Sequence, residues 1–122
     1  MYLLDAINLK INYKLKRHSF LERRSTLRAV DGVNLRINHG QTVALVGESG
    51  CGKSSVARAI LGIIETTKGK ILFEGKDLAA LDKNERKQVW SQMQVVSQDP
   101  VSALNPRLSV GRAIGEPMHI LG

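Results

Sequence analysis

The feature that most constrains this chain is a glycine-rich stretch of eight residues, Gly47-Glu48-Ser49-Gly50-Cys51-Gly52-Lys53-Ser54. The stretch matches the spacing G-x-x-x-x-G-K-[ST] in full, with an apolar segment before it and a helical pattern after it. Its three glycines let the backbone approach a phosphate closely. Successive N–H groups at the start of a helix then form a nest for an anion. The sequence therefore predicts a phosphate-binding loop (P-loop) at a helix N-terminus.

The individual residues of the P-loop have separate expected roles, and the expected ligand is a nucleoside triphosphate with Mg²⁺. Lys53 reaches the β- and γ-phosphates as a positive charge, and the Ser54 hydroxyl is the expected Mg²⁺ ligand. The N–H of Ser55 helps to hold the α-phosphate. Backbone groups of the whole loop from Gly47 to Ser55 contact the nucleotide, so Ser49 and Cys51 take part through their main chain and no redox or nucleophilic role is expected for Cys51. Glu48 is expected to point outward, because a carboxylate inside the nest would repel the phosphate.

Hydrophobic periodicity predicts an α/β chain with an antiparallel element at its N-terminus. Alternation over 7–14, with Ile7 on the buried face, and over 33–37 predicts two half-buried strands, and the apolar segment 42–46 predicts a strand covered on both faces, as in a parallel sheet. A helix is expected over 53–64. Further expectations are turns at 38–40 and 74–76, strands over 71–73 and 94–96, and helices over 84–90 and 109–121, the last interrupted by Pro117.

Charge and composition narrow the function classes. The 122 residues carry 18 basic and 11 acidic side chains, a net charge of +7, and many of the basic ones lie between Lys10 and Arg28. The net charge suits nucleic acid, an anionic membrane surface or a phosphorylated ligand. The basic run itself is typical of a solvated loop, here 15–27. The chain has only five aromatic side chains on which nucleic-acid bases could stack: two Phe, two Tyr and one Trp. No nucleic-acid role is therefore expected. The single cysteine excludes an internal disulfide, and no signal peptide or apolar run of about 20 residues is present, so a cytoplasmic setting is expected.

Two further residues suggest how a nucleotide is held. Tyr13 ends the first predicted strand, where an aromatic ring suits an adenine base, although a core or strand-edge tyrosine is the alternative. Gln98 follows the predicted strand 94–96 in a polar segment bounded by prolines, where its side-chain carbonyl suits a metal ion or an attacking water. A plain surface loop is the alternative there.

The sequence resembles the ATP-binding cassette (ABC) ATPases, specifically the subunits that energise oligopeptide, dipeptide and nickel importers. The resemblance rests on the P-loop and on the strings 28–33 (Arg-Ala-Val-Asp-Gly-Val), 98–100 (Gln-Asp-Pro), 105–107 (Asn-Pro-Arg) and 115–117 (Gly-Glu-Pro). It implies that Tyr13 stacks on adenine and that Gln98 touches Mg²⁺ and senses a membrane partner. It also implies transmembrane permease subunits and a second ATPase subunit as partners, and a place on the inner face of the cell membrane, with membrane contact only through those partners.

The resemblance also implies a division of the chain as a partial nucleotide-binding domain. Residues 1–46 are the β-rich segment with its basic loop, and 47–64 the P-loop and helix. Residues 65–100 lead to the Gln98 segment, and 101–122 begin a helical subdomain.

Several parts of a complete cassette are missing from this sequence. It contains no Leu-Ser-Gly-Gly-Gln signature, no apolar strand ending in Asp-Glu (Asp99 belongs to the Gln98 segment) and no histidine downstream of such a strand. Because phosphoryl transfer depends on positioning and charge stabilisation, we expect at most weak nucleotide binding and essentially no hydrolysis. Strand 42–46 is expected to leave an open sheet edge that favours a homo-oligomer. The alternatives are a non-catalytic remnant of such a subunit and, with less support, a soluble P-loop kinase or GTPase; the guanine-reading string Asn-Lys-x-Asp of the latter is absent.

Overall fold

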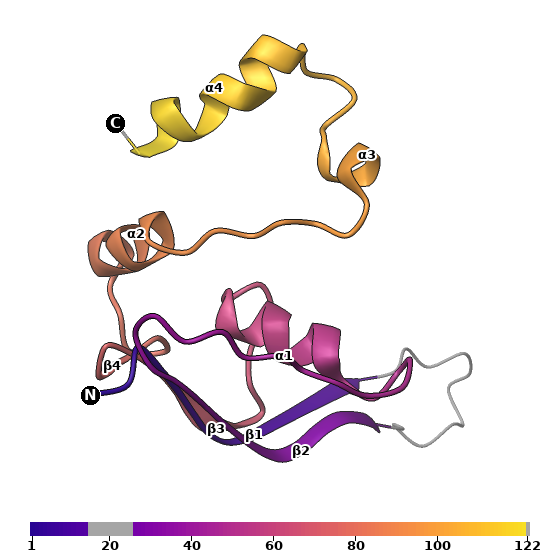
Figure 1. Ribbon diagram of the computed structural model, residues 1–122, viewed down its shortest axis with the longest axis vertical. Helices are drawn as coiled ribbons and strands as arrows, with labels where there is room; N and C mark the ends of the chain where they lie inside the picture. Colours follow the sequence, from indigo (N-terminus) through magenta and orange to yellow (C-terminus); the bar gives the residue numbers. More distant parts are fainter. Residues whose placement is uncertain (15–25, 122) are drawn as a thin grey trace. The chain divides into compact units, whose positions relative to one another are not determined.

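An antiparallel sheet forms the framework of the first part of the chain. The computed structural model describes residues 1–14 and 26–121 and comprises two compact units, Met1–Asp82 and Lys83–Gly122. In the first unit the strands lie in the order β2-β1-β3-β4 (Figure 1). Their bounds are β1 Leu4–Lys14, β2 Thr26–Ile37, β3 Lys68–Phe73 and β4 Lys76–Asp77. The mixed α/β character expected from the sequence is confirmed, but every strand pair in the described residues is antiparallel.

The central strand β1 pairs with β2 along its whole length and with β3 on its other edge. The alternating pattern predicted both β1 and β2, and β2 begins earlier than expected, at Thr26. Nearly all of the predicted basic loop 15–27 lies outside the described residues. The turns after β2 and β3 are present as expected.

A register shift in β1 changes which residues face the core. The pairing of β1 with both neighbours is irregular between residues 6 and 10, and Asn8 has a positive φ of 49°. Such a bulge inserts one residue into the alternation. Ala6 and Leu9 are therefore both fully buried, whereas Ile7 is 38% exposed. The expectation that Ile7 shares the buried face is wrong for this reason.

Helix α1 (Lys53–Ile60) covers one face of the sheet (Figure 1). The core of this unit consists of apolar side chains from β1, β2, β3 and α1: Leu4, Ala6, Leu9, Ile11, Val30, Val56, Ala59, Ile71 and Phe73. The helix ends four residues before the predicted Ile64. Gly62 has φ 68°, its N–H donates to the Ala59 carbonyl, and the Ile63 N–H donates to the Arg58 carbonyl. This is a Schellman termination, and Gly62 is its sequence signal.

The apolar segment 42–46 does not form the predicted buried strand. No strand is present between residues 38 and 52, and Val46 is 91% exposed. A strand buried on both faces needs a hydrogen-bonding neighbour and covering elements. None of the residues that the structure describes forms strand hydrogen bonds with 42–46, so this segment remains irregular.

The second unit contains three helices, α2 (Lys83–Ser91), α3 (Pro100–Ala103) and α4 (Val110–Leu121). Helix α2 confirms the prediction for 84–90. The predicted strand 94–96 is absent, and Val96 is 93% exposed, because no strand pairs with it in the described part of this unit. Helix α4 runs through Pro117 without the expected interruption. Pro117 has no N–H to donate to the carbonyl four residues back, but the helical turns on both sides of it are present. No helix among the described residues is long and apolar enough to cross a membrane.

Candidate functional site

The P-loop runs as a series of turns from the exposed segment after β2 into the first turn of α1. The Cys51 N–H donates to the Glu48 carbonyl at 3.3 Å, and the Val56 N–H donates to the Gly52 carbonyl at 3.0 Å. Gly52 is the N-cap of α1, with φ 95° and ψ 0°, and no side chain caps the helix. A helix begins with N–H groups that have no partner within the helix, and its dipole is positive there. The start of α1 therefore offers backbone donors to an anion.

Gly52 is also required by the packing of the loop against the sheet. A β-carbon built on Gly52 would lie 2.3 Å from the Ala29 carbonyl oxygen and 3.2 Å from Cγ2 of Val30, both on β2. At Gly50, where φ is 83°, the same atom would meet nothing within 4 Å. The sequence pattern predicted that these glycines allow the backbone to approach a phosphate. In the structure, the absence of a β-carbon at Gly52 also lets the start of α1 pack closely against β2.

The Lys53 side chain bends back onto the loop backbone. Its Nζ donates to the carbonyl oxygens of Gly47 at 2.5 Å and Glu48 at 2.6 Å, and to Cys51 Sγ at 3.3 Å. The ammonium group thus lies beside the loop that precedes α1. Its hydrogen bond to the exposed Cys51 thiol lowers the pKa of that thiol below its ordinary value. Glu48 is exposed, as is the rest of the loop up to Cys51.

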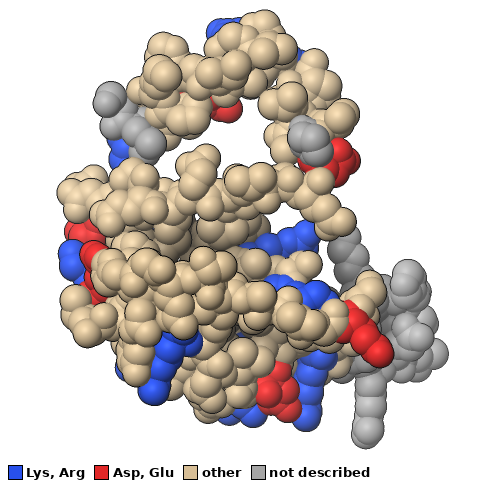
Figure 2. Space-filling view, in the orientation of Figure 1, with Lys and Arg blue, Asp and Glu red and all other residues tan. Residues whose placement is uncertain are grey.

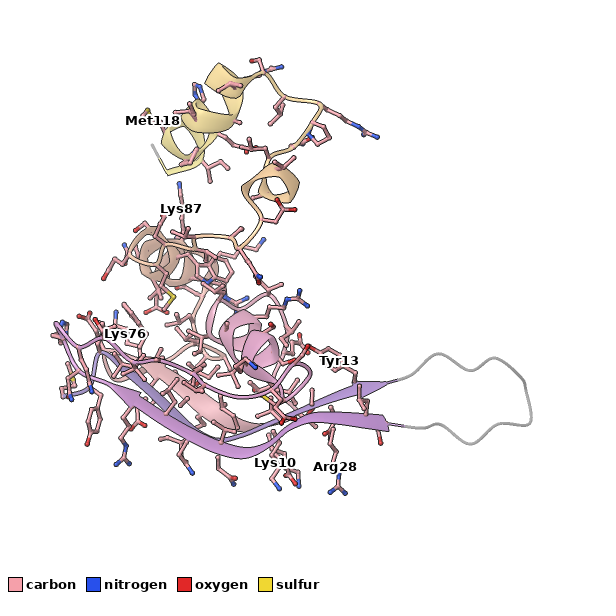
Figure 3. All side chains as sticks on the ribbon, turned by 45° about the vertical axis from the view of Figure 1, so that its right-hand side comes forward. Lys10, Tyr13, Arg28, Lys76, Lys87 and Met118 are labelled. Atoms are coloured by element: carbon pink, nitrogen blue, oxygen red, sulfur yellow. The ribbon has the colours of Figure 1, made fainter. Side chains whose placement is uncertain are left out.

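Tyr13 is brought to the P-loop helix by a hydrogen bond. Near the end of β1 (Figure 3), its hydroxyl lies 3.1 Å from the Ser55 hydroxyl, and the pair is partly buried. Residues 42 positions apart in the sequence are thereby joined. Both Tyr13 and Ser55 were predicted from the sequence to contact the nucleotide. Their hydrogen bond to each other was not predicted. The neighbouring Ser54 is exposed at the first turn of α1.

Gln98 lies in the second unit, in the irregular segment between α2 and α3, and is exposed. The next residue, Asp99, is the N-cap of α3, and its carboxylate accepts a hydrogen bond from the Val101 N–H at 3.0 Å. Asp99 therefore has a structural role at a helix start. Within residues 1–14 and 26–121 no group of three or more His, Cys, Asp or Glu side chains is placed to hold a metal ion.

Comparison with known proteins identifies the family. The model of the ABC transporter family matches residues 30–118, which include the P-loop and α1 through most of α4. The chain belongs to this family.

The curated relatives are peptide transport proteins. The chain is 45% identical over 119 residues to the oligopeptide transport ATP-binding protein OppF of Salmonella typhimurium. It is 41% identical over 118 residues to the dipeptide transport ATP-binding protein DppF of Escherichia coli. These alignments cover 96% and 97% of this chain but 36% and 35% of the relatives. The chain therefore spans about a third of the length of the curated relatives it matches.

Solved structures support the fold. The dimeric structure of a post-hydrolysis state of the ATP-binding cassette MJ0796, bound to ADP and Pi, matches with a TM-score of 0.75 over 98% of this chain and 48% of that chain, at 22% identity. An ATP-binding subunit of an ABC transporter matches with a TM-score of 0.51 and 27% identity over 70% of this chain and 31% of that chain. The ABC ATPase fold predicted from the sequence is thus confirmed.

Proposed function

We propose that this chain is the ATP-binding N-terminal part of the subunit that energises an oligopeptide- or dipeptide-type ABC importer. The observation that carries the proposal is the uncapped start of α1, where the glycine loop packs on β2 and Lys53 lies against the loop carbonyls. The similarity to peptide transport ATP-binding proteins supplies the class of importer.

The geometry suits the phosphates of a nucleotide. The N–H groups at the start of α1 donate to phosphate oxygens, with the help of the helix dipole. The Lys53 ammonium exchanges the carbonyls of Gly47 and Glu48 for the more negative β- and γ-phosphate oxygens, since hydrogen bonds between charged groups are the stronger ones. Mg²⁺ takes few protein ligands and binds mainly phosphate and water, so the single Ser54 hydroxyl fits it. The metal, when bound, neutralises phosphate charge.

The bond between Tyr13 and Ser55 places an aromatic ring near the same nucleotide. The Ser55 N–H is proposed to face the α-phosphate, and the Tyr13 hydroxyl is 3.1 Å from the hydroxyl of that serine. The ring of Tyr13 is therefore within reach of the end of the nucleotide that bears the base. We propose adenine as its partner, stacked on the ring face.

Hydrolysis is proposed to need groups that this sequence does not contain. Transfer of the γ-phosphoryl group requires a positioned water and stabilisation of the charge that develops. We propose that Gln98 contributes to the metal and water contacts in the assembled transporter, together with permease subunits and a second ATPase subunit at the inner face of the membrane. By itself the chain is proposed to bind ATP with little or no turnover.

Titration calorimetry with ATP and Mg²⁺ tests the binding proposal. Lys53→Ala removes a charged hydrogen-bond donor and should weaken binding about 10- to 150-fold. Lys76→Ala, at an exposed lysine of β4, is the matched control and should leave binding unchanged. Equal affinity of Lys53→Ala and the unsubstituted chain would refute the P-loop assignment. Measurable ATP turnover abolished by Lys53→Ala would refute the absence of hydrolysis, and a folded chain without ATP binding would favour the non-catalytic remnant.

A further inference from the structure

The face of the sheet opposite α1 is covered by no element of the first unit in the described residues. Residues directly opposite each other on neighbouring strands point to the same face. Lys10 is opposite Asp31 on β2 and Lys68 on β3, and Ile7 is opposite Lys70. We call the side chains that share this side the outer sheet face: Asp5, Ile7, Lys10, Asn12, Arg28, Asp31, Arg36, Lys68, Lys70 and Leu72. Figure 3 shows Lys10 and Arg28 pointing away from α1.

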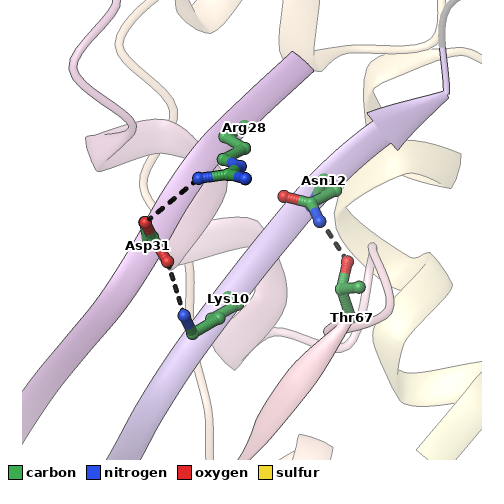
Figure 4. A network of polar contacts seen from close by, with 5 residues as sticks. All are labelled: Lys10, Asn12, Arg28, Asp31 and Thr67. Atoms are coloured by element: carbon green, nitrogen blue, oxygen red, sulfur yellow. Dashed lines mark hydrogen bonds and ion pairs between the residues drawn. The ribbon is translucent and has the colours of Figure 1, made fainter. Parts of the chain in front are cut away.

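The outer sheet face is positively charged. Asp31 is shared by two cations, since its carboxylate lies 2.8 Å from Lys10 Nζ and 3.8 Å from Arg28 (Figure 4). Asp5 pairs with Arg36 at 3.3 Å. Two carboxylates thus face five cations. The Lys and Arg side chains project along the lower border of the first unit, with Asp and Glu between them (Figure 2).

Lys68 and Lys70 carry the uncompensated charge. Both are exposed, and neither has an ion pair with any residue that the structure describes. Lys68 is directly opposite Lys10, and like charges in this position destabilise a sheet. Asp31 offsets the charge of Lys10 but is already divided between two partners. A bound anion would relieve this repulsion.

The apolar members of the face favour a lipid surface over nucleic acid. Ile7 is 38% exposed and Leu72 is partly exposed, and they lie between the cations on the same side of the sheet. Tyr2 borders the face, but its ring is occupied by Arg36, whose guanidinium carbon lies 5.1 Å from the ring centroid. The face therefore offers no free ring for base stacking. Exposed lysines with interspersed apolar groups suit the headgroup region of a membrane that contains anionic lipids.

We propose that the outer sheet face docks directly on a membrane surface that bears anionic lipid headgroups. Lys68 and Lys70 are the principal contacts, and Ile7 lies at the level of the headgroups between them. This contact is separate from the P-loop, which lies at the start of α1 on the other side of the sheet. It departs from the expectation that the chain reaches the membrane only through partner subunits.

Vesicle sedimentation of the 122-residue chain tests the proposal. The probes are vesicles of phosphatidylcholine alone and of phosphatidylcholine mixed with phosphatidylglycerol. We expect binding to the mixed vesicles only, weakened by added salt because the contact is electrostatic. Lys68→Gln with Lys70→Gln should lower the affinity on the order of 30-fold, from the contribution of each lysine near an anionic surface.

Two control variants, each with two lysine substitutions like the test variant, show whether the position or the charge of the lysines matters. Lys76→Gln with Lys87→Gln removes the same charge from exposed lysines of β4 and α2 and should bind like the unsubstituted chain. Lys68→Arg with Lys70→Arg keeps the charge and should also bind. The proposal fails if both Gln pairs weaken binding equally, if the unsubstituted chain ignores anionic vesicles, or if a short oligonucleotide competes fully at the same face.

Discussion

Replacement of Gly52 by alanine tests whether the P-loop is held by its fit against β2. The substitution puts a β-carbon at a residue with φ 95°, where an L side chain is strained by about 1–2 kcal/mol. It also places that carbon 2.3 Å from the Ala29 carbonyl oxygen, a backbone atom that cannot swing away. Overpacking of this kind costs about 1–3 kcal/mol. The two effects together predict a loss of about 2–5 kcal/mol in the free energy of unfolding.

Gly50→Ala separates the two effects within the same loop. Gly50 has a similar φ of 83°, but a β-carbon there would meet nothing within 4 Å. This variant should lose only the conformational part, about 1–2 kcal/mol. Urea unfolding followed by circular dichroism measures both variants, and ATP titration of each at low urea reports on the loop itself. Equal losses for Gly50→Ala and Gly52→Ala would show that the contact with β2 does not constrain the loop, and the packing argument would be abandoned.

The remaining predictions concern two side chains at the P-loop. Tyr13→Phe should keep ATP affinity nearly unchanged if the ring stacks on adenine, while Tyr13→Ala should weaken it about 5- to 150-fold in calorimetric titration; equal losses would point to the hydroxyl instead. Because the hydrogen bond from Lys53 lowers the pKa of the Cys51 thiol below its ordinary value, iodoacetamide should alkylate this thiol with a midpoint at lower pH than an ordinary cysteine. Lys53→Met should move that midpoint upward, and an unchanged pH profile would contradict the contact.

The parts of the fold that sequence patterns predicted correctly depend on neighbours close in the chain. Apolar and polar residues alternate in both β1 and β2, and the two strands are consecutive in the sequence and pair with each other. Each strand therefore finds its hydrogen-bonding partner in the next strand of the chain. The P-loop prediction likewise rests on a local pattern, because the spacing of its glycines and lysine reflects local backbone geometry. The bulge at Asn8 and the bond from Tyr13 to Ser55 were missed, because they arise from how β1 meets β3 and α1, and a single sequence does not show such contacts.

The two strands that were predicted but are absent, 42–46 and 94–96, have one property in common. Both predictions rest on a few consecutive apolar residues, 43–46 and 95–96, and that pattern indicates burial on both faces without saying what covers them. β3 is also short, yet it forms because β1 offers a free edge, and its Ile71 and Phe73 are buried in the core of the unit. Val46 and Val96 have no such neighbours in the described residues and are 91% and 93% exposed. An apolar run therefore predicts a requirement for a partner, and it becomes a strand only where another segment supplies the hydrogen bonds.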